Sequence, residues 1–183
     1  MLPLIVDDSD TKQAAFADDL CGAGRLQSLQ KWWARIEQTG PLFGYFPKAT
    51  KSWLVVKDEK LEEAKVMFAD TNLKITASGR RYLGSFIGNQ EGLRAYKKEL
   101  VEKWISDIDT LSEIAKSEPQ AVYSCFTHGW LHKLNYFLRV IPDFANELKL
   151  LDETIDLKLL PLMLGRKNIS ENELYVLVIN HSK

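Results

Sequence analysis

One segment decides most of the fold, Glu91-Gly-Leu-Arg-Ala-Tyr-Lys-Lys-Glu-Leu-Val-Glu-Lys-Trp-Ile-Ser-Asp-Ile-Asp-Thr-Leu111. Its large apolar side chains recur at steps of three and four residues. They are Leu93, Tyr96, Leu100, Trp104, Ile108 and Leu111. This spacing is typical of an amphipathic helix. We therefore predict a long helix over residues 90–116, ended by Ser117-Glu118-Pro119.

The sequence that follows continues the helical pattern. A second helix is predicted from Pro119 toward Arg139, because proline is common in the first turn of a helix. A third is predicted from Asp143 to about Leu160. Residues 161–183 show no clear period apart from an apolar run at 174–179. The second half of the chain is thus predicted to be helical.

The sequence before residue 89 mixes short strands and helices. A β-hairpin is predicted over residues 12–20, with Asp18 and Asp19 at its turn and Gly22 and Gly24 closing it. Helices are predicted at 23–37 and 60–68, and strands at 52–57, 72–76 and 81–87. The chain is therefore predicted to be α+β, with a boundary between two lobes near residue 89.

The composition sets wide limits on function. The chain has 183 residues, 45% of them apolar, and a net charge of −1, so its bulk charge gives no argument for nucleic-acid binding. Cys21 and Cys125 form no CxxC pair, which favours neither zinc nor a disulfide framework and points to a cytoplasmic or nuclear protein. The apolar start is a poor signal peptide, and no run reaches the ~20 residues that span a bilayer, so no membrane is expected.

Asp18 and Asp19 are the chemical feature of the first half. Adjacent carboxylates at a tight turn repel each other, and a cation between them relieves the repulsion. Two-metal phosphoryl transfer uses such a pair, and hard oxygen ligands suit Mg²⁺. The alternative is an ordinary solvated turn, because turns favour aspartate.

Three segments together resemble reverse transcriptases, in the order that family has them. Phe16-Ala-Asp-Asp19 resembles motif C. Gly44-Tyr-Phe-Pro-Lys-Ala-Thr-Lys-Ser52 resembles motif D, with Lys48 where the family usually has asparagine. Arg81-Tyr-Leu-Gly-Ser-Phe-Ile-Gly88 resembles motif E, the primer grip. Pro119-Gln-Ala-Val-Tyr123 and Phe126-Thr-His-Gly129 are similar to thumb segments of related retroelement polymerases.

The resemblance implies a small antiparallel palm remnant with helices over 1–89, an all-helical thumb over 90–160 and a tail over 161–183. The implied reaction is RNA-directed DNA polymerisation, in which Mg²⁺ on Asp18 and Asp19 serves attack of a primer 3′-hydroxyl on a dNTP. Lys51 would assist the leaving pyrophosphate. Tyr82, Leu83 and Gly84 would position the primer end. The implied contacts to the primer–template (RNA/DNA) are Lys51, Arg80, Arg81, Lys133 and Arg139.

The sequence also departs from the family. Only 17 residues precede Asp18, too few for motif A, which carries the third metal carboxylate, and for motif B. We therefore expect a truncated retroelement product that lacks the N-terminal palm and fingers and is inactive by itself. A non-catalytic nucleic-acid-binding or protein-interaction module is the alternative.

The histidines and tryptophans give less evidence about function. His128 and His132 lie four apart on a predicted helix, as a zinc pair would, but no third ligand is apparent and a polar surface is the better interpretation. Trp32, Trp33, Trp53, Trp104 and Trp130 are predicted to be core residues rather than base-stacking platforms.

Overall fold

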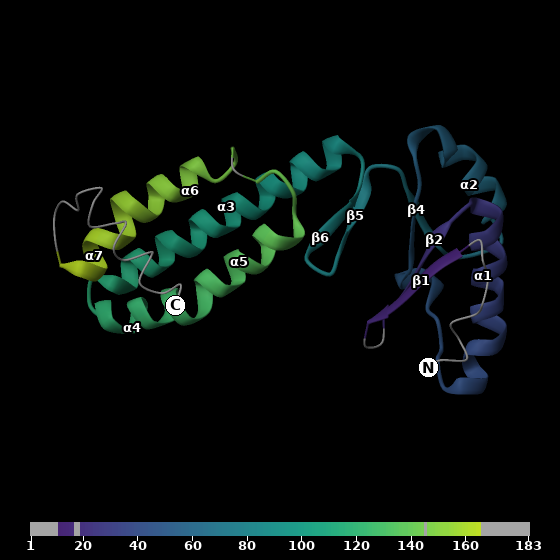
Figure 1. The fold of residues 1–183 in the computed structure, drawn as a ribbon, viewed down its shortest axis with the longest axis horizontal. Helices are drawn as coiled ribbons and strands as arrows, with labels where there is room; N and C mark the ends of the chain where they lie inside the picture. Colours follow the sequence, from purple (N-terminus) through teal and green to yellow (C-terminus); the bar gives the residue numbers. More distant parts are fainter. Residues whose placement is uncertain (1–10, 17–18, 145, 166–183) are drawn as a thin grey trace. The chain divides into compact units, whose positions relative to one another are not determined.

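The computed structural model describes residues 11–16, 19–144 and 146–165 (Figure 1). Its secondary structure is α+β, as predicted. The chain divides into two compact units, residues 1–80 and 81–183, each of which is described by itself.

The first unit begins with the predicted hairpin. Strands β1 (Thr11–Phe16) and β2 (Asp19–Gly24) pair antiparallel, with Phe16 opposite Asp19. Helix α1 (Leu26–Thr39) follows and buries Trp33 and Ile36. A Cβ atom on Gly22 would lie 3.1 Å from the ring of Trp32, so this glycine lets the indole pack on the strand.

Short elements complete the first unit. They are the 3₁₀ helices Gly40–Phe43, Ala49–Lys51 and Asp58–Lys60, strand β3 (Trp53–Val55), helix α2 (Leu61–Met67) and strand β4 (Lys74–Thr76). Strands β3 and β4 pair in parallel, with α2 in the connection between them. Gln30 of α1 donates a 2.7 Å hydrogen bond to the carbonyl of Met67, and Ala64 and Phe68 are buried.

The second unit combines a β-hairpin with a helical bundle. Strands β5 (Gly79–Tyr82) and β6 (Ser85–Gly88) form the hairpin, and the division between the units falls inside β5. Helix α3 (Gln90–Ala115) begins at Asn89, whose side chain accepts a hydrogen bond from the Gly92 amide. The apolar residues at the predicted three-and-four spacing face the core, with Trp104 and Ile108 almost fully buried and Leu93 and Leu111 partly buried.

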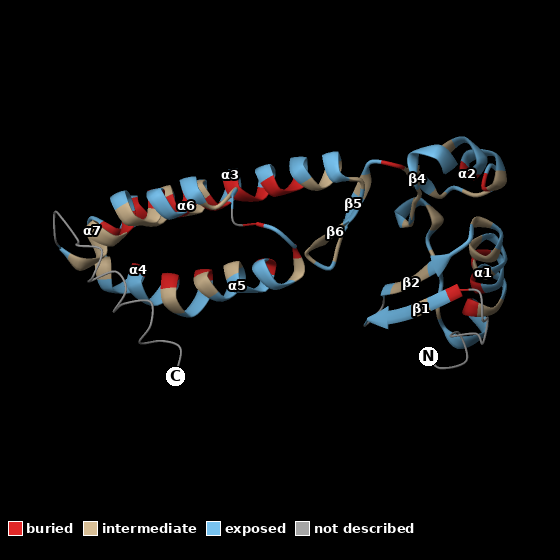
Figure 2. Ribbon diagram, turned by 45° about the horizontal axis from the view of Figure 1, so that its top comes forward, coloured by how far each residue is buried: buried red, intermediate tan, exposed pale blue. Residues whose placement is uncertain are grey.

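Two further helical segments pack along α3. The first runs through α4 (Pro119–Cys125), a π-helical turn (Phe126–Trp130) and α5 (Leu131–Val140). The second runs through α6 (Lys149–Thr154), another π-helical turn (Ile155–Leu159) and α7 (Leu160–Leu164). Their buried positions lie on the faces that these helices turn to one another (Figure 2). The ring of Trp104 contacts those of Phe137 and Phe144, with centroids 5.5 and 5.4 Å away.

Several predicted details were wrong. Residues 81–87 are not one strand, because the chain reverses at Leu83-Gly84. The β3–β4 pair is parallel, so the small sheets are not all antiparallel. The third helix begins at Lys149, six residues later than predicted, because Asp143 has a positive φ of 52° that interrupts any helix there. The units divide at 80/81 rather than near 89, because the β5–β6 hairpin is bonded to the helices that follow it.

Candidate functional site

The residues predicted to act in catalysis and in holding the primer end lie on three local structures. The first is the β1–β2 hairpin. Asp19 is the first residue of β2 and is exposed, and it makes no ion pair with any described residue. Asp18 lies outside the described residues. A hairpin is present where one was predicted, but it extends to Gly24, so that Gly22 and Gly24 lie within β2 rather than after the hairpin. Asp19 lies in the strand next to the turn and is exposed.

The second structure is the turn that carries Lys51. The 3₁₀ helix Ala49–Lys51 follows Lys48, whose carbonyl accepts hydrogen bonds from the Lys51 amide and from the amide and hydroxyl of Ser52, at 2.9, 3.1 and 3.0 Å. These bonds build the turn without an asparagine at position 48. Lys51 is exposed, and no hydrogen bond or ion pair between described side chains joins it to Asp19.

The third structure is the tip of the β5–β6 hairpin, Leu83-Gly84. Both residues have positive φ, 45° and 78°. A two-residue connection with positive φ at both positions matches the right-handed twist of paired strands. The left-handed conformation costs a residue such as leucine about 1–2 kcal/mol. Leu83 nevertheless occupies it and leaves 40% of its surface exposed.

Two tyrosines hold this strained tip. The Tyr136 hydroxyl of α5 donates a 2.5 Å hydrogen bond to the Leu83 carbonyl, and the Tyr96 hydroxyl of α3 donates a 3.0 Å bond to that of Gly84. Ser85 donates a 2.7 Å bond to the Val140 carbonyl. The pKa of Tyr96 is raised, chiefly by burial, so the hydroxyl remains a donor at neutral pH. The hairpin tip is therefore fixed to the helical bundle.

Gly84 has a second reason to be glycine. A Cβ atom there would lie 2.6 Å from Cε1 of the Tyr136 ring, closer than two carbon atoms can approach. Glycine at position 84 is thus favoured both by the positive φ of the tip and by the ring that covers it.

The predicted nucleic-acid contacts differ in their availability. Lys51, Arg80, Arg81 and Arg139 are exposed and make no ion pair with a described residue. Lys133 instead forms a 3.1 Å ion pair with Asp107 of α3. The Lys133 charge is thus partly neutralised inside the protein, whereas the other four are available to a ligand.

His128 lies within the π-helical turn, where its Nδ1 is 2.9 Å from the Thr127 hydroxyl and 3.2 Å from the Ser124 carbonyl. Within the described ranges, no three histidine, cysteine, aspartate or glutamate side chains lie together as metal ligands would. The π turn itself was not predicted. Gly129 inside it is exposed, and a Cβ atom there would meet nothing within 4 Å.

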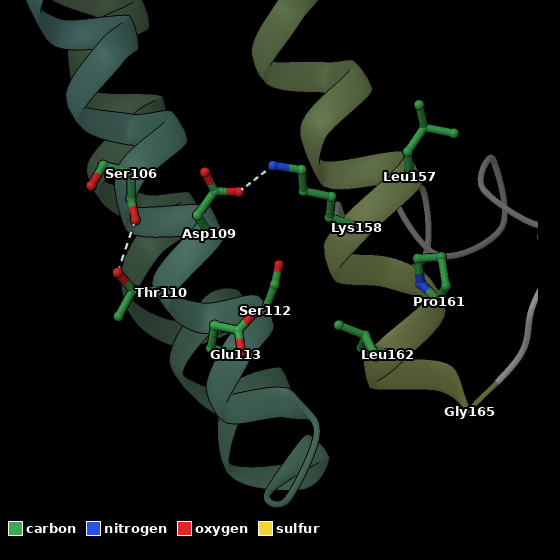
Figure 3. A pocket seen from close by; sticks show the side chains of 10 residues that line it. All are labelled: Ser106, Asp109, Thr110, Ser112, Glu113, Leu157, Lys158, Pro161, Leu162 and Gly165. Carbon is green, nitrogen blue, oxygen red and sulfur yellow. Dashed lines mark hydrogen bonds and ion pairs between the residues drawn. The ribbon is translucent and has the colours of Figure 1, made fainter.

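An open groove of about 910 Å³ lies between α3 and the segment 155–165 (Figure 3). Polar Asp109, Thr110 and Glu113 line one side, and Leu157 and Leu162 the other. A 2.6 Å ion pair between Lys158 and Asp109 crosses it. None of the predicted site residues lies in this groove, and its central charges are already paired.

Sequence reasoning missed Tyr136 and Tyr96 as supports of the hairpin tip. It also placed Trp53 in the core, where Trp33, Trp104 and Trp130 are indeed buried. Trp53 is 38% exposed and carries two cations on its ring. Residues 44–88 contain eight basic and five acidic residues, and this excess was the sequence feature that pointed to cations around Trp53.

Comparison with protein-family models, with curated proteins and with solved structures finds no match to this chain. Among the helices of the described residues, none combines the length and the apolar character needed to cross a membrane.

Proposed function

We propose that this chain binds a nucleic-acid primer–template, as the end of the palm and the thumb of a reverse transcriptase do. The three motifs support the proposal by their order and by their local structures. A hairpin carries Asp19 beside its turn, a 3₁₀ turn presents Lys51, and a second hairpin presents Leu83. A helical bundle follows directly, where the family has its thumb.

The observation that carries the proposal is the conformation of Leu83. An exposed leucine at a φ of 45° is strained, and backbone strain concentrates at functional sites, where the surrounding structure over-determines it. Hydrogen bonds from Tyr136 and Tyr96 provide that support here. In the proposed function, Tyr82, Leu83 and Gly84 hold the primer end against the bundle.

The metal part of the proposal rests on Asp18 and Asp19. Asp19 fits a divalent cation, because its carboxylate is exposed, hard and free of ion pairs with described residues. In the complete polymerase domain Asp18 and Asp19 would hold two Mg²⁺ ions, which would supply activation of a primer 3′-hydroxyl and binding of the dNTP triphosphate. Lys51 would neutralise charge on the leaving pyrophosphate. The protein's own contribution is to hold the Asp19 carboxylate at the start of β2, beside the antiparallel pairing of Phe16 with Asp19.

A protein-interaction module is the second candidate, and one observation favours it. Leu42, Phe43 and Phe46 of the first unit expose 78%, 52% and 69% of their surface. These three residues lie within five positions of the sequence, and contiguous exposed apolar side chains mark interaction sites in many proteins. This candidate predicts no affinity for nucleic acid.

A titration of a labelled RNA–DNA primer–template separates the two. The proposal expects a dissociation constant of about 10⁻⁴ to 10⁻⁶ M at physiological salt, tightening as salt falls, because contacts are to the backbone. Arg139→Gln should weaken binding, whereas Lys158→Gln, which removes a cation already paired with Asp109, should have a smaller effect. A folded chain that does not bind even at low salt would contradict the proposal and leave the interaction module.

A further inference from the structure

A cluster of one tryptophan and two cations lies on the surface of the first unit. Trp53 is the first residue of β3, and Lys74 is its partner in the parallel register of β3 and β4. Arg80 follows in β5. The Lys74 ammonium lies 5.3 Å from the centroid of the Trp53 ring, and the Arg80 guanidinium carbon lies 4.5 Å from it.

The strand pairing explains the cluster. Side chains directly opposite one another in paired strands lie on the same face of the sheet, which places Lys74 beside the indole. Arginine stacks readily on an aromatic face. Each cation–π contact at an exposed position contributes about 0.5–1 kcal/mol, enough to restrict where the charge lies without neutralising it.

Two lysines on or beside α2 have a different environment. Lys60 and Lys65 bind Glu63 and Glu62 at 2.6 and 2.7 Å on or beside α2. Lys74 and Arg80 have no ion pair with a described residue, although they share one ring. Two positive charges held close together repel each other, and an anion between them relieves the repulsion.

We propose that Trp53, Lys74 and Arg80 form a binding site for the phosphodiester backbone of single-stranded nucleic acid. The two cations contact phosphate oxygens, and the exposed part of the indole packs against a neighbouring base. An accessible aromatic ring among cations is typical of single-strand sites, because duplex bases are stacked and unavailable. The choice of nucleic acid among phosphate ligands rests on the function proposed above.

The contrast between the two lysine environments supplies a matched experiment. The full chain is titrated with a fluorescently labelled oligothymidylate by anisotropy, over a series of salt concentrations. The double substitution Lys74→Gln/Arg80→Gln is compared with Lys60→Gln/Lys65→Gln, which changes the net charge of the same unit equally. Unfolding transitions of both variants establish that each is folded.

The site predicts a clear difference between the two variants. Lys74→Gln/Arg80→Gln should lose about tenfold in affinity, and the slope of log affinity against log salt should become shallower by about 1.4, since each phosphate contact on a single strand contributes about 0.7. The control should change affinity by much less. Trp53→Leu should also weaken binding, and Trp53→Phe should retain most of it, since an aromatic ring is kept.

Equal losses in both double variants would overturn the inference, because bulk charge alone would then explain the binding. Unchanged affinity in Lys74→Gln/Arg80→Gln would overturn it as well, leaving the cluster a structural contact. The two proposals fail separately. Loss of single-strand binding in these variants, in a chain that does not bind primer–template, would refute the thumb proposal and support this site. Primer–template binding by the chain, with single-strand binding unchanged in these variants, would support the thumb proposal and refute this site.

Discussion

The hydroxyl of Tyr136 donates a 2.5 Å hydrogen bond to the carbonyl of Leu83, a residue 53 positions earlier in the chain. The same tyrosine ring covers Gly84 so closely that no side chain fits there. The conformation of the β5–β6 hairpin tip therefore depends on contacts with α5, a helix more than 40 residues later in the sequence. Disturbing the packing of α5 should change the conformation of the tip.

Two glycine substitutions test this dependence. Gly84→Ala should destabilise the chain by about 2 kcal/mol, because it combines a positive φ with a clash against the Tyr136 ring. Gly129→Ala should stabilise it by about 0.5–1 kcal/mol, since Gly129 lies in a helical segment with open space around it. Urea unfolding measures both free energies. A Gly84→Ala variant as stable as the wild type would show that the tip is free to move away from Tyr136.

The neighbouring residues Lys97 and Lys98 of α3 should contribute differently to the stability of the fold. Its side chain is 7% exposed, forms a 3.6 Å ion pair with Glu147 and donates a 2.6 Å hydrogen bond to the Asp143 carbonyl. Lys97→Met should cost about 1–3 kcal/mol, because it removes a partly buried hydrogen bond to Asp143 and the ion pair with Glu147.

Lys98→Met is the matched control. Lys98 is largely exposed and only 3.9 Å from Glu102, so its removal should change stability by less than about 0.5 kcal/mol. Thermal unfolding of the two variants provides the comparison. Equal midpoints for Lys97→Met and Lys98→Met would mean that the buried contact contributes nothing to the fold.

Asp152 predicts a pH-dependent effect. Burial, and secondly the nearby Asp156, raise the pKa of its carboxyl above the usual value of 3.8. The folded state therefore binds this proton more tightly than the unfolded state, so the contribution to stability is full below the unfolded pKa and is lost as pH rises through the folded pKa. Asp152→Asn should accordingly stabilise the chain at pH 7 and have little effect near pH 3.

Glu153→Gln serves as the control for this charge change, because Glu153 is the next acidic residue of the same helix. Chemical unfolding at a series of pH values from about 3 to 7 follows both variants. A gain for Asp152→Asn that grows as pH falls would contradict the predicted sign.

Several features of this chain could be predicted from local patterns. The periodic apolar residues of α3, the proline that opens α4 and the hairpin at Asp19 depend on neighbours within a few positions. The α+β composition follows from them. For these elements, the physical determinants are helix amphipathicity and turn chemistry, which are written into consecutive residues.

Other features depend on residues far apart in sequence. Leucine at the first position of a hairpin turn is not a turn signal, and hydrogen bonds from Tyr136 and Tyr96 stabilise that conformation. The parallel pairing of β3 with β4 places Lys74 beside Trp53, and so a tryptophan predicted to be buried lies on the surface. The sequence by itself determined that residues 90–115 are helical and that a hairpin lies around Asp19. Tertiary structure alone decided which side chains meet, because contacts between distant segments depend on the packing of the whole unit and not on local spacing.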